Sequence, residues 1–359
     1  MKFSKKKLPK SQIALEVQLT PEELGNHREE AVMTLAKDLR LEGFRPGHVP
    51  AQVAEKHVGE VAILSEAARF AIAEVYHNIV EQECLDVIGE PEVRVLKLAP
   101  GNPLEFRVQV AVLPDIELPD YKKIAETVAR KEVRVEEKNV DETLQWLRES
   151  RKVPAQSPEG IEADPPQSEG LGGKDKGEVP LDDNFAKSVG NFADLASLRA
   201  SIQEGLQHEK EMQERDRLRQ EIIEKIAARS KLEIPDVLVE REKQVLLSEV
   251  KRGVEQMAQM PFAEYAQKAG KTEQELFESF GQEAEQRVKR FLVLREVAKR
   301  ENITPTPEEV TQEAQAILKH YTSLQKAKQA LDPDRLREYT EGVLRHEKTL
   351  QFLEQFVKP

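Results

Sequence analysis

The first clear pattern in the chain is an alternation of apolar and polar residues. From Ile13 to Leu19 every second residue is aliphatic, which is typical of a strand with one buried face. The run from Thr20 to Glu23 then supplies a capping threonine, a proline at the first helical position and a glutamate three residues after the cap. This pattern predicts a helix that extends to about Arg40.

The period then changes to steps of three and four. Pro50 opens a short helix that ends at Gly59, and a longer helix follows with an apolar stripe at Val61, Leu64, Ala68, Ile72, Val75 and Ile79. Two strands, at 93–95 and 104–112, are joined by a turn rich in Pro and Gly. Residues 1–112 therefore predict a small α+β domain, in which a helix–loop–helix tip projects from a three-stranded sheet.

The next part of the chain reads as a connecting arm and a linker. Residues 113–152 contain an extended, proline-bearing run, a short strand expected around Val133 and Val135, and a helix lined by Val140, Leu144 and Leu147. These apolar positions suggest that the arm packs on another domain. Residues 153–180 mix Pro and Gly with polar and charged residues, which predicts a flexible linker and not a domain.

Residues 181–359 are helical throughout. Apolar stripes recur at helical spacing and include Val245, Phe291, Tyr339 and Val343, while the opposite faces are charged. The stripes are narrow for such long helices, so the sequence predicts an elongated all-α domain of hairpins and arms.

Composition agrees with long, solvated helices. Of the 359 residues 33% are charged and 5% aromatic, and the net charge is −12. Any contact with RNA must then come from a local basic patch. The single cysteine, Cys84, excludes an internal disulfide and fits a reducing cytosol. The lysine-rich start lacks a following apolar region, so we expect a cytosolic protein that does not contact a membrane.

Catalytic and metal-binding signatures are missing from the sequence. The seven histidines are scattered, and there is no phosphate-binding glycine loop or nucleophile elbow. We therefore expect that the protein binds no cofactor or metal and is not an enzyme.

The most unusual stretch is Gly43-Phe44-Arg45-Pro46-Gly47-His48-Val49-Pro50. Gly and Pro make up half of it, which predicts a stiff, exposed turn that carries an aromatic ring beside cationic side chains. Two readings of Phe44 stay open: its ring folds back onto the core, or it binds a partner.

These eight residues closely resemble the ribosome-docking signature of the bacterial trigger factor family, chaperones that meet nascent chains at the ribosomal tunnel exit. The stretch from Pro114 to Arg151, which includes the motif Pro-Asp-Ile-Glu-Leu-Pro-Asp-Tyr, resembles the connecting arm of that family. Leu181 to Ala186 looks like the start of its C-terminal chaperone domain. Residues 1–112 would then be the ribosome-binding domain and residues 181–359 the helical substrate cradle.

The resemblance implies specific partners and residues. The partners would be the large ribosomal subunit, through ribosomal protein and rRNA at the tunnel exit, and nascent or unfolded polypeptides, with a weak homodimer off the ribosome. The docking residues would be Gly43, Phe44, Arg45, Pro46, Gly47 and His48. His48 departs from the lysine that is usual there, and a half-charged imidazole is a weaker partner for phosphate.

Client binding and isomerase activity are the remaining expectations. Met257, Met260, Phe262 and Tyr265 are candidates for holding unfolded chains, with ordinary packing at a hairpin tip as the alternative. Family members usually carry a prolyl isomerase domain of the FKBP type where this chain has residues 153–180, a segment too short and too polar to be one. The resemblance thus implies an ATP-independent chaperone without isomerase activity. A hidden isomerase, or a ribosome-independent helical scaffold or assembly factor, are the alternatives.

Overall fold

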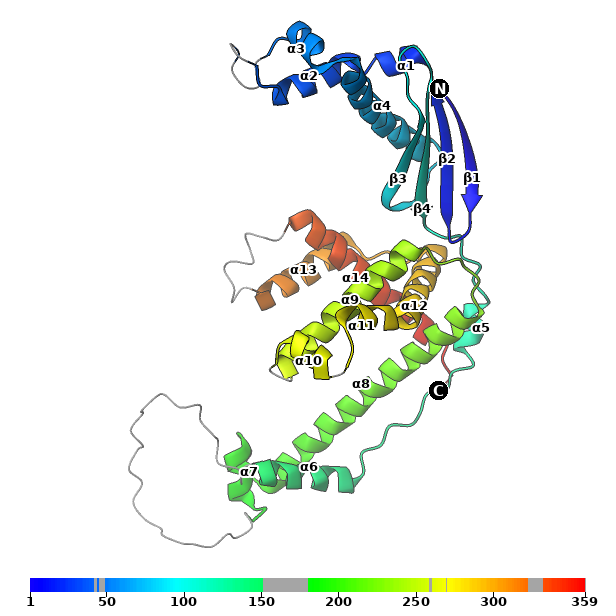
Figure 1. Cartoon of the computed structure of the whole chain (residues 1–359). Coiled ribbons are helices and arrows are strands. Elements are labelled where there is room, and N and C mark those ends of the chain that lie inside the picture. The colour runs from blue at the N-terminus through cyan, green and yellow to red at the C-terminus, as the bar shows by residue number, and fades with distance from the viewer. Residues whose placement is uncertain are drawn as a thin grey trace, which may run out of the picture. The chain divides into compact units, whose positions relative to one another are not determined.

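The computed structural model describes residues 1–41, 44, 49–150, 180–257, 260–268, 270–321 and 332–358 (Figure 1). These residues form two compact units. The first contains residues 1–119 and 226–346, and the second contains residues 120–225 and 347–359. The expected linker falls almost wholly outside the described residues.

A four-stranded antiparallel sheet organises the N-terminal region. Its strands are β1 (Lys2–Leu8), β2 (Gln12–Leu19), β3 (Val87–Lys97) and β4 (Leu104–Val112), in the order β1-β2-β4-β3. The prediction of three strands was wrong, because β1 is a lysine-rich edge strand whose side chains are mostly exposed. Such a strand shows no apolar alternation.

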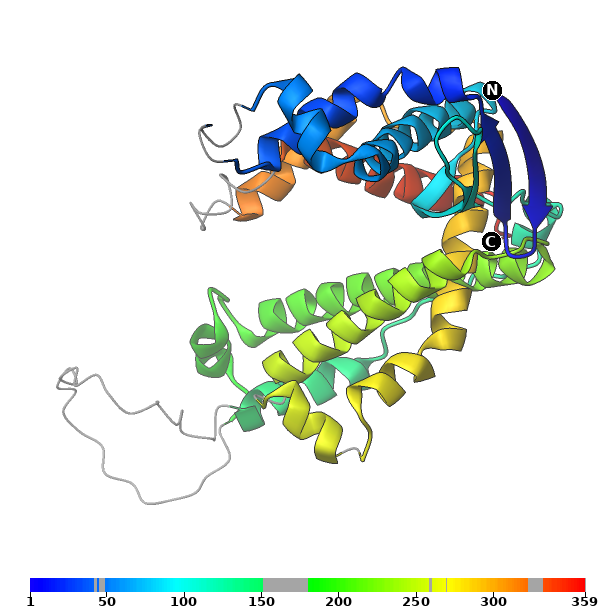
Figure 2. The same cartoon turned by 45° about the horizontal axis from the view of Figure 1, so that its top comes forward.

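Four helices accompany this sheet: α1 (Pro21–Gly25), α2 (Arg28–Asp38), α3 (Ala51–Val58) and α4 (Glu60–Gln82). The single helix expected to reach Arg40 is in fact two helices, which meet at Asn26 and His27. Figures 1 and 2 both show α4 lying along the sheet. Ala67 and Ala71 of α4 are buried in the same core cluster as Leu15 of β2 and Phe106 of β4.

The connecting arm contains α5 (Tyr121–Ala125) and α6 (Glu137–Ser150). The strand expected at Val133 and Val135 is absent, since both residues lie in extended chain without a ladder. Val135 instead packs against the helical core described next.

In the second unit, α6 packs with α7 (Asp183–Val189) and the first half of α8 (Leu195–Arg229). Val140, Leu144, Phe185, Ala186 and Leu198 are the buried side chains of this core. On the outer face of α6 the tryptophan Trp146 is 65% exposed.

The remaining helices are α9 (Asp236–Met257), α10 (Phe262–Lys268), α11 (Glu273–Ser279), α12 (Gly281–Arg300), α13 (Pro307–Tyr321) and α14 (Pro333–Glu354). α9 packs on α12, where Ala284, Val288 and Leu292 are buried. Across the described parts of the chain, no helix combines the length and apolar character needed to cross a membrane. The α+β and all-α fold classes predicted from the sequence are confirmed.

Candidate binding surfaces

The loop between α2 and α3 exposes an aromatic ring. Phe44 is 40% exposed, and its backbone N–H donates to the carbonyl of Leu41 at 3.2 Å. The other predicted docking residues, Gly43, Arg45, Pro46, Gly47 and His48, lie outside the described residues. Phe44 is thus the one member of this group whose placement can be argued from the structure.

The two ends of this loop are anchored in the core. Leu39 and Leu41 are half-buried against the core cluster, and Val49 is buried within it. The apolar residues before and after the loop therefore hold its base, and Phe44 does not share their burial.

An arginine ties together the helices that carry the loop. Arg28, at the start of α2, donates to Glu55 of α3 at 2.7 Å and to Glu60 of α4 at 2.7 Å. The hydrogen bond from Arg28 lowers the pKa of Glu60 below its ordinary value, so Glu60 keeps its charge further into the acid range. All three side chains are partly exposed, and we assign them a role in orienting the helices more than in stability.

The predicted client-binding residues lie where α9 leads into α10, and they differ in how far their side chains are exposed. Phe262 is buried, Tyr265 is 37% exposed and Met260 is half-buried, while the side chain of Met257 lies outside the described residues. The rings of Phe262 and Tyr265 are 6.2 Å apart, and the Lys251 ammonium lies 5.1 Å from the Phe262 ring. Phe262 therefore anchors this turn, and Tyr265 is the ring that it presents to solvent.

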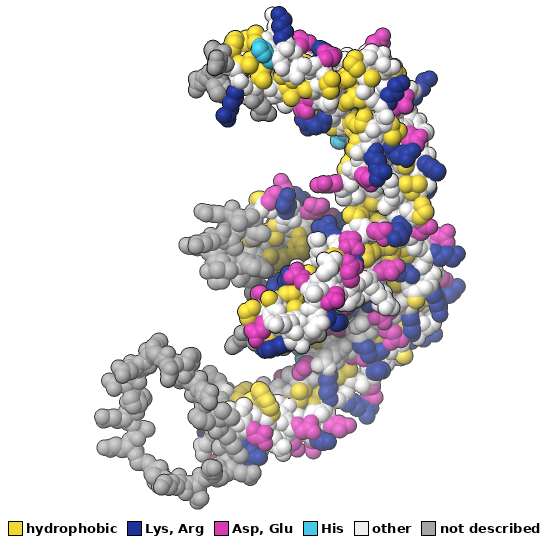
Figure 3. Space-filling view, viewed as in Figure 1, with side chains coloured by type: hydrophobic (Ala, Val, Ile, Leu, Met, Phe, Trp, Pro, Cys, Tyr) yellow, Lys and Arg dark blue, Asp and Glu magenta, His cyan; other side chains and the backbone are white. Residues whose placement is uncertain are grey.

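Other exposed apolar side chains escaped the sequence reasoning. Val245 on α9, Phe291 on α12, and Tyr339 and Val343 on α14 all sit on predicted apolar stripes, yet each is exposed. Periodicity places a residue on a stripe but does not say whether another helix covers it. Figure 3 shows such hydrophobic side chains, in yellow, dispersed among charged ones.

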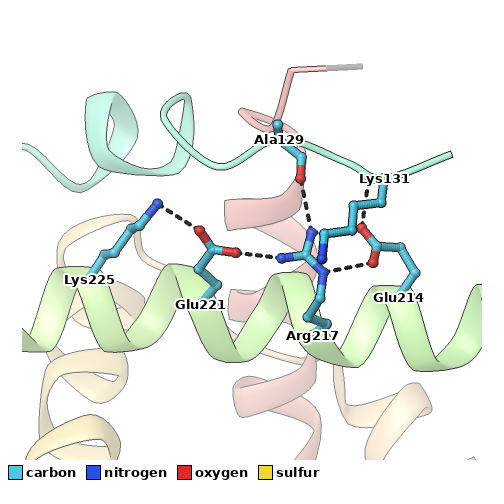
Figure 4. Close-up of polar contacts among 6 residues, drawn as sticks. All are labelled: Ala129, Lys131, Glu214, Arg217, Glu221 and Lys225. Atoms are coloured by element: carbon cyan, nitrogen blue, oxygen red, sulfur yellow. Dashed lines mark hydrogen bonds and ion pairs between the residues drawn. The ribbon is translucent and has the colours of Figure 1, made fainter.

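A polar network joins the connecting arm to α8 in the second unit (Figure 4). Arg217 donates to both carboxylate oxygens of Glu214, at 2.7 and 2.8 Å, and to the carbonyl of Ala129 at 3.0 Å. The backbone N–H of Lys131 donates to Glu214 at 2.7 Å. The hydrogen bonds from Arg217, with that from Lys131, lower the pKa of Glu214 to about 2.

In the part of the chain that the structure describes, no group of three or more His, Cys, Asp or Glu side chains could hold a metal ion.

Comparison with known proteins gives one consistent result. The family model described as bacterial trigger factor protein (TF) matches residues 1–147, and the model for the C-terminus of the same protein matches residues 194–355. Together these matches cover most of the chain. They leave the region between 147 and 194 unmatched.

Curated relatives align along the whole chain. The trigger factor of Caldicellulosiruptor bescii is 26% identical over 429 residues, covering 100% of this chain and 97% of the relative. That of Moorella thermoacetica is 28% identical over 436 residues, covering 100% and 95%. Both alignments are longer than the 359 residues of this chain, so these relatives carry residues with no counterpart here.

A solved structure shares the fold. It is described as "Promiscuous Substrate Recognition in Folding and Assembly Activities of the Trigger Factor Chaperone", with a TM-score of 0.56 and 19% identity, and the match covers 99% of each chain. The order of sheet, connecting arm and helical hairpins therefore corresponds to an arrangement already seen in a solved protein.

Proposed function

The chain belongs to the bacterial trigger factor family, and we propose that it is a ribosome-associated chaperone that shields nascent and unfolded polypeptides without using a nucleotide. The family assignment also favours this function over a ribosome-independent scaffold.

The proposal of ribosome docking rests on one observation, the exposed ring of Phe44. Burying the exposed part of this ring against a partner is favourable, because it removes apolar surface from water. Arg45 follows directly in the sequence and can pair with a phosphate or a carboxylate at the tunnel exit. The partner would be the large ribosomal subunit, through ribosomal protein and rRNA.

Client binding would use the exposed apolar side chains of the helical region. Tyr265, Phe291, Tyr339 and Val343 each expose an apolar side chain to solvent. Burying one such side chain contributes about 1.5–3 kcal/mol, so a client needs several of them at once and can still be released. Met260 is half-buried and would add an adaptable contact, and Met257 stays a candidate from the sequence.

We further propose that the protein lacks prolyl isomerase activity. The matched regions end at 147 and resume at 194, and the polar sequence between them is too short for a typical domain. Its relatives are longer, which is consistent with loss of a domain from this place.

The test replaces Phe44 and Arg45 by alanine and measures co-sedimentation with ribosomes. We expect ribosome affinity to fall by at least about tenfold, the equivalent of losing one buried aromatic contact. Suppression of aggregation of a denatured protein in free solution should stay at the parent level. Val61→Ala is the matched control, because Val61 is an exposed apolar residue of the same domain and is not one of residues 43–50. If the double variant binds ribosomes as the parent does, the loop is not the anchor.

A further inference from the structure

A groove of about 690 Å³ lies between helix α4 and strand β3 of the N-terminal domain. Its walls are mainly apolar: Ala68, Ile72 and Tyr76 come from α4, Val93 and Val95 come from β3, and Leu98 follows that strand. The groove lies in a different part of the domain from the loop that carries Phe44.

The groove is an extension of the hydrophobic core, at a place where α4 does not fully cover the sheet. In the β3–β4 ladder Val93 is opposite Val108, and Val95 is opposite Phe106. Val108 and Phe106 are completely buried, whereas Val93 is 41% and Val95 is 49% exposed. Residues opposite one another point to the same face of a sheet, so these two valines extend a buried face into solvent.

Strand β3 also offers an open backbone edge. Among the strands that the structure describes it pairs with β4 alone, and it forms one edge of the sheet in Figure 1. Register shifts lie between Ile88 and Glu92 and between Val95 and Lys97. The regular stretch from Glu92 to Val95 is therefore short, and pairing to it would be brief and weak.

The charged groups around the groove are paired with one another. Arg69 donates to Glu66, with Nε–O distances of 3.1 Å, and His77 lies 3.1 Å from Glu81. On the outer face of β3, Arg94 donates to Glu92 at 2.9 Å. Arg69 and Arg94 are thus each compensated by a carboxylate, so neither cation favours an anionic occupant.

We propose that this groove binds an extended segment of unfolded polypeptide. The segment pairs as an added strand with Glu92–Val95 and places alternate apolar side chains against Val93, Val95 and the α4 wall. An open strand edge beside an apolar groove is the geometry of strand addition, in which backbone bonds give affinity and alternate side chains give selectivity. This inference rests on the proposed function and deepens it, since it names the conformation of client that the N-terminal domain accepts.

The test uses the full chain and a benzophenone-labelled peptide, Ser-Val-Thr-Val-Ser-Val-Thr-Ser, with crosslinks mapped by mass spectrometry. We expect crosslinks within residues 65–77 and 91–98. Val95→Asp should reduce them about tenfold, since burial of one aliphatic side chain is at stake. Val61→Asp, an equal change at an exposed position of α4 outside the groove, should leave the crosslinks unchanged.

A second variant, Ala73→Trp, controls for the case in which Val95→Asp disrupts the folding of β3. Ala73 is exposed on the α4 wall, so a larger side chain there fills the groove without disturbing the core. It should also reduce crosslinking about tenfold. Crosslinks that map elsewhere, or that survive both groove variants, overturn the proposal.

Backbone pairing is tested with two further peptides, each N-methylated at one of the two alternating sets of residues. At least one of them should lose crosslinking, because methylation removes the amide donors that face β3. Equal crosslinking by all three peptides shows that the groove does not pair strands, and this overturns the proposal. A Val95-dependent homodimer that excludes the peptide also overturns it, because the occupant is then a second copy.

Ribosome co-sedimentation is measured on the same samples. If the peptide does not crosslink while the protein still sediments with ribosomes in a Phe44-dependent way, the groove proposal is rejected and ribosome docking stands. Intact crosslinking without sedimentation rejects the proposed ribosome docking and leaves the groove standing.

Discussion

Glu214 shows how a single carboxylate can hold a segment that lacks secondary structure of its own. It accepts hydrogen bonds from the Arg217 guanidinium and from the backbone N–H of Lys131. The arm around Ala129 forms no long strand, and it is tied to α8 by these bonds, by the one from Arg217 to the Ala129 carbonyl and by one from Lys210 to the Arg134 carbonyl. The anion is the form that accepts them, so this contact depends on pH.

The first prediction follows from the lowered pKa of Glu214. A carboxyl group with a pKa of about 2 in the folded protein and 4.5 as its ordinary value stabilises the fold fully above pH 4.5. That stabilisation is lost as pH falls from 4.5 towards 2. Hydrogen exchange of residues 126–136, corrected for the intrinsic rate, should therefore rise across this window.

Two variants of α8 control this experiment. Glu214→Gln should show fast exchange in the arm already at pH 6, with little further change on acidification. Glu204→Gln, at an exposed position of the same helix, should behave as the parent does. A parent whose arm exchanges equally at pH 5 and pH 2.5 contradicts the assignment.

A second prediction concerns Arg219, whose side chain is largely buried. Burial opposes its charge, but hydrogen bonds with Glu347, at 2.8 Å, and with Glu354 outweigh this and raise the pKa of Arg219. Arg219→Ala leaves two carboxylates without their cation, and should lower the free energy of unfolding by about 2 kcal/mol. Urea unfolding measures it. Arg199→Ala, which breaks an exposed pair with Asp141, should cost much less, and equal losses would contradict this account.

At the scale of helices and strands, the sequence reports best on elements whose signals are local. The capping signal at Thr20 correctly marked the start of α1, and the alternation from Ile13 to Leu19 marked β2. Elements defined by their neighbours were harder to predict. β1 is held by pairing with β2, and the valines at 133 and 135 alternate without a partner strand.

The same arrangement of a capping threonine and a glutamate three residues later recurs at the start of α13, and it gives the third prediction. The Thr306 hydroxyl accepts from the N–H of Glu309 at 3.3 Å, and the Glu309 carboxylate accepts from the N–H of Thr306 at 2.7 Å. Thr306→Ala should destabilise α13 by about 1 kcal/mol, whereas Thr306→Ser keeps the acceptor and most of the stability. Hydrogen exchange in the first turn of α13 is the measurement, and equal protection in both variants would argue against a role for the cap.

For the whole molecule, a short loop motif carried most of the functional information. Sequence alone indicated the family from residues 43–50, and the family matches agree with it. The apolar surfaces could not be foreseen in the same way. Phe262 and Tyr265 are three residues apart on one helix, yet the first is buried and the second exposed, because only tertiary packing decides which is covered.

The fourth prediction is the absence of prolyl isomerase activity in the purified protein. The polar residues 153–180 offer too few apolar side chains to form a pocket for a proline ring. A protease-coupled assay on a proline-containing peptide should give the uncatalysed rate. Acceleration that persists after deletion of residues 153–180 would show that another part of the chain is catalytic.

The exposed indole of Trp146 decides what fluorescence can report about this protein. It is the single tryptophan of the chain, so emission excited at long wavelength comes from one position on α6. Because the ring is already 65% exposed, its emission should lie close to that of an unfolded chain and change little on denaturation. Circular dichroism is thus the better probe of unfolding, and Trp146 is better used as a local reporter of events near α6.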